Sequence, residues 1–296
     1  MRLSIVFFVL LLPSWAAAQE CTVTVLASFY DQLTKDEIET LKTEDFAVKI
    51  EGKTLPVQSA SRDFHNRLLI LLETEGSAKN EKLAELVNTV TTQAREAPEG
   101  QPVAFGVFAG KSLFTKEFLA DPEKRAKAVN AVIEEAGSMG KDAALWDALH
   151  QALAVFGPHQ PGDTILLVGD PYDNASHHSA ENVEKEFIAN ETRLFMMRRS
   201  HGSHVDRDFL WRTHELEKMV LDRLTQETGG LLSEYVASLI RFGWAGYMLE
   251  FKLPPGTRRT HKWKVQFRGA AAEKHKKTNY YFPALLPRCQ GAQAEH

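Results

Sequence analysis

Oxygen-bearing side chains directly follow two apolar runs of this 296-residue sequence. Glu73, Glu75 and Ser77 come after the run LLILL, and Asp170 comes after the run TILLV. Carboxylate and hydroxyl oxygens are the hard ligands that magnesium, manganese and calcium prefer. These four residues are therefore candidates for a divalent-cation site, provided that the fold brings the two turns to one edge.

Histidines form a second candidate group, made of His177, His178, His201, His204 and His214. Imidazole suits zinc. The spacings match no helical H-E-x-x-H arrangement, however, and no cysteine is near. We interpret these histidines as parts of solvated polar loops, which a zinc titration of the purified protein would test.

The sequence lacks the usual motifs of nucleophilic hydrolases and of nucleotide-binding proteins. The sequence has no G-x-S-x-G elbow and no G-x-x-x-x-G-K-[ST] loop. Ser203 is not bounded by a strand and a helix in the way a nucleophile requires. We therefore expect no enzyme, and a metal-assisted or histidine-assisted hydrolase is kept as the alternative.

The first 18 residues have the pattern of a secretory signal peptide. Arg2 precedes the apolar stretch 3–12, and Ala16-Ala17-Ala18 predicts cleavage before Gln19. The competing interpretation is an uncleaved anchor, but the apolar stretch is well short of the roughly 20 residues that span a bilayer. We expect an exported protein, periplasmic or secreted, with no membrane span after cleavage.

Two cysteines remain in the mature chain, Cys21 and Cys289. In an exported protein an even number of cysteines favours a disulfide, and the ends of a domain often lie close together. The sequence thus predicts a bridge between the two, although two isolated cysteines could also stay free.

The overall composition is that of an ordinary globular protein, with 44% hydrophobic and 25% charged residues. The formal net charge of −4 predicts no nucleic-acid partner. Lys, Arg and His crowd the stretch 258–277, which we interpret as a solvated face and not as a site for an anionic partner.

The spacing of apolar residues predicts the elements that must position these side chains. Alternation at 22–27 and 46–50 predicts strands of a small β unit. From residue 67, buried strands alternate with amphipathic helices. The strands are expected at 68–72, 102–108, 164–168 and 192–197, and the helices at 79–95, from 122, 143–156, 180–188 and 206–228. Further strands at 247–253 and 262–268, joined by a turn at 254–256, predict a hairpin.

Strands and helices that alternate in this way predict an α/β fold with a doubly wound, mostly parallel sheet. Flanking β segments precede and follow it. We expect an N-terminal β segment at 19–66, the α/β domain at 67–235 and a C-terminal β extension at 236–296. In such a fold, ligands gather beyond the carboxyl ends of the strands, where Glu73 and Asp170 would lie.

A family resemblance runs through these blocks of sequence. The segments "RLLILLETEGSAKNEKL", "PVAFGVFAGK", "GKDAALWDALHQAL", "DTILLVGDPYDNASHHS" and "LDRLTQETGG" resemble successive parts of a von Willebrand factor type A (VWA) domain. They are most similar to the bacterial VWFA-related proteins found in acidobacteria. The segments "LTKDEIETLKTEDFAVKIEGKTLPV" and "GYMLEFKLPPGTRRTHKWKVQFR" are similar to the β segments that flank the domain in that family.

The resemblance implies a metal-ion-dependent adhesion site at the carboxyl edge of the sheet. Such a site takes a D-x-S-x-S motif, a threonine and an aspartate from three loops. In this chain Glu73, Glu75 and Ser77 stand at the positions of that motif, Ala143 stands at the threonine and Asp170 at the final aspartate.

Three of these positions depart from the family pattern. Glu73 is one methylene longer than aspartate and overruns a site sized for magnesium, whose ligands lie at about 2.0–2.1 Å. Ala143 offers no side-chain oxygen, and Glu75 replaces a neutral hydroxyl by a carboxylate. We expect a degenerate site that binds no cofactor, or that binds calcium or magnesium weakly.

The sequence therefore predicts an exported, non-enzymatic module for protein–protein interaction or adhesion. Its partner would be another protein of unknown identity. A purely structural envelope module is a second alternative, which differs only in whether the loops at the carboxyl edge recognise anything.

Overall fold

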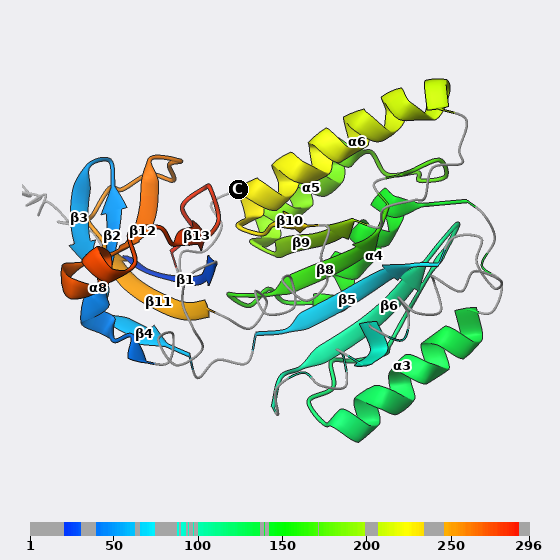
Figure 1. Cartoon of the computed structure of the whole chain (residues 1–296), viewed down its shortest axis with the longest axis horizontal. Helices are drawn as coiled ribbons and strands as arrows, with labels where there is room; N and C mark the ends of the chain where they lie inside the picture. Colours follow the sequence, from blue (N-terminus) through cyan, green and yellow to red (C-terminus); the bar gives the residue numbers. More distant parts are fainter. Residues whose placement is uncertain are drawn as a thin grey trace, which may run out of the picture.

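Two units make up the computed structural model of the chain, a β unit and an α/β unit (Figure 1). The residues described are 21–30, 40–62, 66–74, 88, 90–92, 94, 97, 100–136, 139, 142–170, 172–198, 207–233 and 246–289, with only the backbone described over 207–216. The predicted signal peptide lies outside them. Among the described residues, no helix is long and apolar enough to cross a membrane.

Strands from both ends of the chain build the β unit. One sheet has the order β13-β1-β11-β4 and the other has the order β12-β2-β3. The strands are β1 (Cys21–Tyr30), β2 (Phe46–Ile50), β3 (Lys53–Pro56), β4 (Ser59–Ser61), β11 (Gly246–Leu253), β12 (Trp263–Phe267) and β13 (Asn279–Tyr281). A short 3-10 helix, η1 (Thr43–Asp45), and helix α8 (Gly269–Lys274) complete the unit.

Alternating side chains hold the two sheets of the β unit together. Val23 and Val25 of β1 share one buried core with Phe46 and Val48 of β2, and with Val265 of β12. The strands therefore pack as two layers with an apolar interior, as period-two alternation requires.

The hairpin predicted between 247–253 and 262–268 is wrong. Strand β11 pairs with β1 and β4, whereas β12 pairs with β2 in the other sheet. The connection from residue 254 to residue 262 is too long for a tight turn, so it carries the chain from one sheet to the other.

The predicted disulfide between Cys21 and Cys289 is confirmed. The two Cα atoms lie 5.3 Å apart, although 268 positions separate the cysteines in sequence. The bridge joins the first residue of β1 to the end of the described chain, and it borders the core of the β unit.

The α/β unit has a six-stranded sheet of order β10-β9-β8-β5-β6-β7, which confirms the predicted fold class. All neighbouring strands are parallel except β7, which runs antiparallel to β6. The strands are β5 (Leu68–Glu73), β6 (Val103–Phe108), β7 (Ser112–Phe114), β8 (Thr164–Gly169), β9 (Arg193–Arg198) and β10 (Leu232–Ser233).

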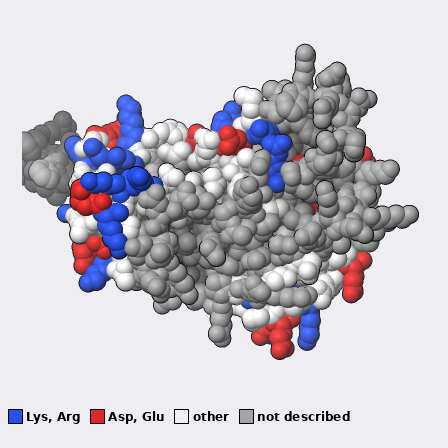
Figure 2. Space-filling model, in the orientation of Figure 1, with Lys and Arg blue, Asp and Glu red and all other residues white. Residues whose placement is uncertain are grey.

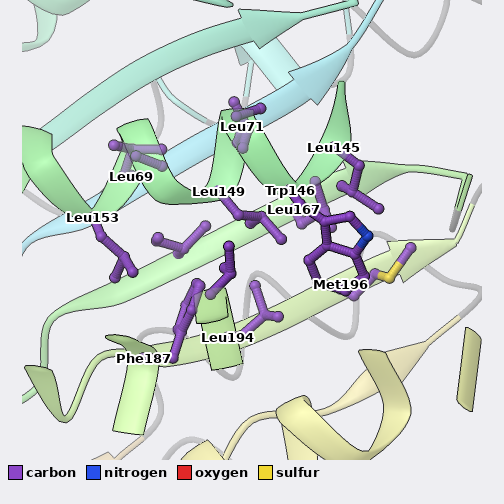
Figure 3. Packing of buried hydrophobic residues seen from close by; sticks show 14 of the residues in the cluster. Leu69, Leu71, Leu145, Trp146, Leu149, Leu153, Leu167, Phe187, Leu194 and Met196 are labelled. Carbon is purple, nitrogen blue, oxygen red and sulfur yellow. The ribbon is translucent and has the colours of Figure 1, made fainter. Parts of the chain in front are cut away.

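Helices cover both faces of this sheet, α3 on one and α4, α5 and α6 on the other (Figure 1). They are α3 (Pro122–Ala136), α4 (Leu145–Phe156), α5 (Ala180–Asn190) and α6 (Arg207–Thr228). Residues 88, 90–92 and 94 are helical, within the helix predicted at 79–95, whose other residues lie outside the described part. Figure 3 shows how Leu149 and Phe187 pack with Leu69, Leu71 and other sheet residues.

The β unit sits against the amino ends of the strands of the α/β sheet. Arg193 opens β9, and its Nη1 donates to Ser28 Oγ of β1 at 3.1 Å while Nη2 donates to the Gly229 carbonyl at 2.6 Å. Burial lowers the pKa of Arg193 to about 9, so the guanidinium stays charged at neutral pH. The carboxyl ends of the strands consequently point away from the β unit.

Candidate functional site

Glu73 and Asp170 meet at the carboxyl edge of the sheet, as the topology required. Glu73 ends β5 and is fully buried, and its Oε2 accepts a hydrogen bond from the Asp170 backbone N–H at 2.6 Å. A Cβ on Gly169 would lie 2.6 Å from the same oxygen, so a glycine is needed for this approach. The Glu73 carboxylate thus ties the end of β5 to the end of β8.

Hydrogen bonds tie the backbone of Ala143 to the loop that contains Asn174 and Ala175. The Ala143 N–H donates to Asn174 Oδ1 at 2.8 Å, and the Ala143 carbonyl accepts from the backbone N–H groups of Asn174 and Ala175 at 2.9 and 3.2 Å. Glu75 and Ser77 lie outside the described residues. Of the predicted site residues that the structure describes, Glu73 and Asp170 are in direct contact.

The loop 172–178 caps helix α4, an arrangement that sequence analysis missed. Asp173 Oδ1 accepts from Leu145 N–H at 2.8 Å, and Ser176 Oγ accepts from Trp146 N–H and Asp147 N–H at 2.9 and 3.1 Å. These are N–H groups of the first turn, which lack partners inside a helix. The signal was the cluster of Asp, Asn and Ser in "DPYDNASHHS", since these residue types favour caps. Here they cap a helix about 30 residues earlier in the chain.

Histidines gather around Asp147 on the outer side of α4. Asp147 accepts the backbone N–H of both His177 and His178, and Nδ1 of His178 lies 2.7 Å from Asp147 Oδ1. The His178 ring stacks on His150 with centroids 4.0 Å apart, and His150 Nδ1 lies 2.7 Å from Glu186 Oε2.

His177 and His178 lie in the polar loop 172–178, as the sequence analysis expected, and the cluster adds a contact that it did not predict. His177 has a 92% exposed side chain, but His178 packs on His150, which the sequence had not singled out. Burial raises the pKa of Asp147. The hydrogen bonds from the two backbone N–H groups and the two imidazoles lower it by more than burial raises it, so the net pKa lies well below the ordinary value. Residues 201 and 204 lie outside the described part, as does the side chain of His214.

The cluster does not assemble a hydrolytic site. Asp147 orients the His178 imidazole in the manner of a catalytic dyad. The nearby hydroxyl of Ser176 is engaged elsewhere, because it accepts the two helix N–H groups and donates to Asp173 Oδ1 at 2.5 Å. Its role is to cap α4, which leaves it unsuited to attack a substrate.

The described positions of the predicted adhesion site offer few free oxygens for a cation, and Glu75 and Ser77 lie outside the described residues. One Glu73 oxygen is committed to a backbone amide, and Ala143 presents only a backbone carbonyl that already accepts two hydrogen bonds. Within the described part of the chain, no three His, Cys, Asp or Glu side chains are grouped so that they could hold a metal ion.

Glu217 of α6 connects the capping loop to the last long helix. Its Oε2 accepts from Asp173 N–H at 2.9 Å. Burial raises the pKa of Glu217, the Asp173 N–H lowers it and the Asp173 charge raises it, for a net value of about 7. The folded protein therefore favours the protonated carboxyl near neutral pH.

We expect stability to fall as pH rises from about 4.5 to about 7, because the folded state binds the Glu217 proton more tightly than the unfolded chain does. Glu217→Gln mimics the protonated form and keeps an acceptor for Asp173. The variant should melt higher than the parent protein at pH 8 and equally at pH 4, in a series of thermal melts. Glu135→Gln, an exposed change on α3, is the control. A gain of equal size at both pH values would contradict the titration of Glu217.

Comparisons with known proteins give likenesses of structure only. No family model matches the sequence, and no curated protein matches it. The solved structure of BatB from Bacteroides thetaiotaomicron is 14% identical and covers 60% of this chain and 94% of its own, with a TM-score of 0.43. A von Willebrand factor type A protein from Catenulispora acidiphila is 12% identical and covers 84% and 69%, with a TM-score of 0.47.

A third similar structure is proximal thread matrix protein 1 from the mussel byssus, solved with a zinc-occupied MIDAS motif. It is 14% identical and covers 66% of this chain and 49% of its own, with a TM-score of 0.47.

Proposed function

We propose that this protein is an exported, non-enzymatic interaction module with a VWA-like domain, which recognises a protein partner without a metal ion. The observation that carries the proposal is the contact between the Glu73 carboxylate and the Asp170 backbone amide. In an adhesion site, the residues at these positions would face a cation. Here the two residues join the ends of β5 and β8 to each other. The loops can therefore keep the shape of an adhesion site without its metal ligands.

The carboxyl-edge loops remain the proposed contact surface. The capping loop is fixed to α4 by side chains of Asp173, Asn174 and Ser176, which holds it in one conformation. His177 projects from this loop with a 92% exposed side chain. A rigid loop with an exposed tip loses little conformational entropy when it binds a partner.

Export is part of the proposal. The pattern of residues 1–18 and the disulfide between Cys21 and Cys289 both favour an oxidising compartment, periplasmic or extracellular. The compartment is tested by locating the protein in cell fractions and by sequencing the N-terminus of the mature form, which should begin at Gln19.

Added cations should leave the melting temperature unchanged. We expect no rise when magnesium, manganese or calcium is added to chelator-treated protein, because no described oxygen cluster is available to bind them. The measurement is a set of thermal melts of the mature protein beside Asp170→Ala. A rise with one cation that disappears in the variant would show that the site still holds metal.

Partner binding is tested by cross-linking from the surface itself. A photoreactive residue placed at position 177 should cross-link a protein of the source cells, and chelator should not reduce the yield. The same residue at position 123, exposed at the start of α3 on the opposite edge, is the matched control. Equal products from both positions, or a yield that depends on divalent cations, would contradict metal-free recognition by the carboxyl edge.

A further inference from the structure

The β unit carries a large excess of positive charge. Residues 40–62 and 246–289 contain fourteen Lys and Arg and five Asp and Glu, in a chain whose formal net charge is −4. Figure 2 shows these basic side chains gathered at the end formed by β2, β3, β12 and α8. These residues thus carry a net charge of +9, opposite in sign to the charge of the chain.

Lysines line the outer face of the sheet β12-β2-β3. Trp263, Val265 and Phe267 point into the core, so the residues between them point outward. Lys264 of β12 stands directly opposite Lys49 of β2, and both are at least partly exposed. Like charges opposite one another destabilise a sheet. The pair of lysines therefore does not stabilise the fold, and folding alone gives no reason for its presence.

Lys262 extends this row beyond the start of β12. None of the ion pairs in the described part of the chain includes the ammonium group of Lys49, Lys262 or Lys264. Of the nearby carboxylates, Asp45 accepts the Lys42 backbone N–H at 2.8 Å, and Glu51 lies in the adjoining turn. The nearby carboxylates therefore neutralise only part of the positive charge on the outer face of the sheet β12-β2-β3.

The form of this face indicates the chemistry of its partner. Its outward positions on β12 are Lys264 and Gln266, with no aromatic ring on which a nucleic-acid base could stack. The cavities found in the described residues lie elsewhere, along the junction with the α/β unit. A flat face of lysines suits a flat layer of phosphates, since lysine acts as a mobile point charge.

We propose that the basic end of the β unit docks this protein on an anionic lipid membrane surface, which replaces the interpretation of residues 258–277 as a solvated face without an anionic partner. Docking in this way places the carboxyl-edge loops at the distal end, because the β unit contacts the amino ends of the strands, where Arg193 donates to Ser28 and Gly162 lies beside Leu26 and Met248. The described residues of the α/β unit then face away from the lipid. The loops that recognise a partner are presented to the aqueous phase.

Vesicle co-sedimentation of the mature, disulfide-bonded protein tests this proposal. The protein should bind vesicles of phosphatidylcholine with about a quarter phosphatidylglycerol, and should not bind phosphatidylcholine alone. Binding should be lost at about 0.5 M salt, where exposed charges are screened. The triple variant Lys49→Glu, Lys262→Glu and Lys264→Glu should lower the partition coefficient by about a hundredfold.

The matched control reverses three lysines of the α/β unit, Lys116→Glu, Lys124→Glu and Lys127→Glu, which are exposed on and near α3. It changes the net charge equally and should bind like the parent protein. An equal loss in both variants, or an unchanged affinity in the first, would overturn the proposal. Binding to a soluble acidic polysaccharide with none to anionic vesicles would overturn it as well, and would assign the face to a different partner.

Discussion

Removal of the disulfide between Cys21 and Cys289 is expected to lower the free energy of unfolding by about 2–5 kcal/mol. The bridge closes a loop across 268 sequence positions, so it restricts almost the whole mature chain in the unfolded state. It also holds the two ends of the β unit, in which β1 pairs with β11 over eight residues. Without it, the chain ends separate freely on unfolding.

The measurement is urea-induced unfolding of the parent protein and of the double variant Cys21→Ser and Cys289→Ser. A reducing agent should destabilise the parent to the level of the variant, and it should have no effect on the variant itself. A parent protein that unfolds at the same urea concentration with and without reductant would show that the bridge contributes nothing to stability.

Asp163→Ala is expected to cost about 3–5 kcal/mol, because it leaves a largely buried guanidinium without its counter-charge. Asp163 is 1% exposed and accepts from Arg67 Nε at 2.8 Å and from Arg67 Nη2 at 2.6 Å. The Arg67 guanidinium lies 5.3 Å from the Phe156 ring centroid and 5.5 Å from that of Phe118. This pair joins the starts of β5 and β8 at the centre of the sheet.

Chemical denaturation of the single and double variants measures the effect. Arg67→Met combined with Asp163→Ala should recover part of the loss, since it removes the isolated charge together with its partner. Glu181→Ala serves as control, because its pair with Lys185 on α5 is exposed and screened by solvent, so it should contribute little to stability. If Asp163→Ala costs no more than Glu181→Ala, the buried pair is not the tie between the two strands.

The elements of the α/β unit followed from local sequence. Leu68–Leu72 is apolar at every position, and such a run is typical of a strand covered on both faces. Helix α6 ends at Thr228, as the predicted helix 206–228 does, and Gly229 follows it with φ of +77°, a conformation that favours glycine. The short strands β4, β7, β10 and β13 were not predicted, because two or three residues carry no periodic signal and their pairing depends on neighbours that are distant in the chain.

The α/β fold class was predictable from the sequence by itself. So were the pairing of the two cysteines and the position of Glu73 and Asp170 at the carboxyl edge of the sheet. Only the tertiary structure decided what these residues do there. The bond from Asp170 N–H to Glu73 spans 97 positions, and the cap of α4 by Asp173 and Ser176 spans about 30. Local propensity cannot choose between a carboxylate that faces a cation and one that binds a backbone amide, because that choice depends on which groups the folded sheet brings within hydrogen-bonding distance.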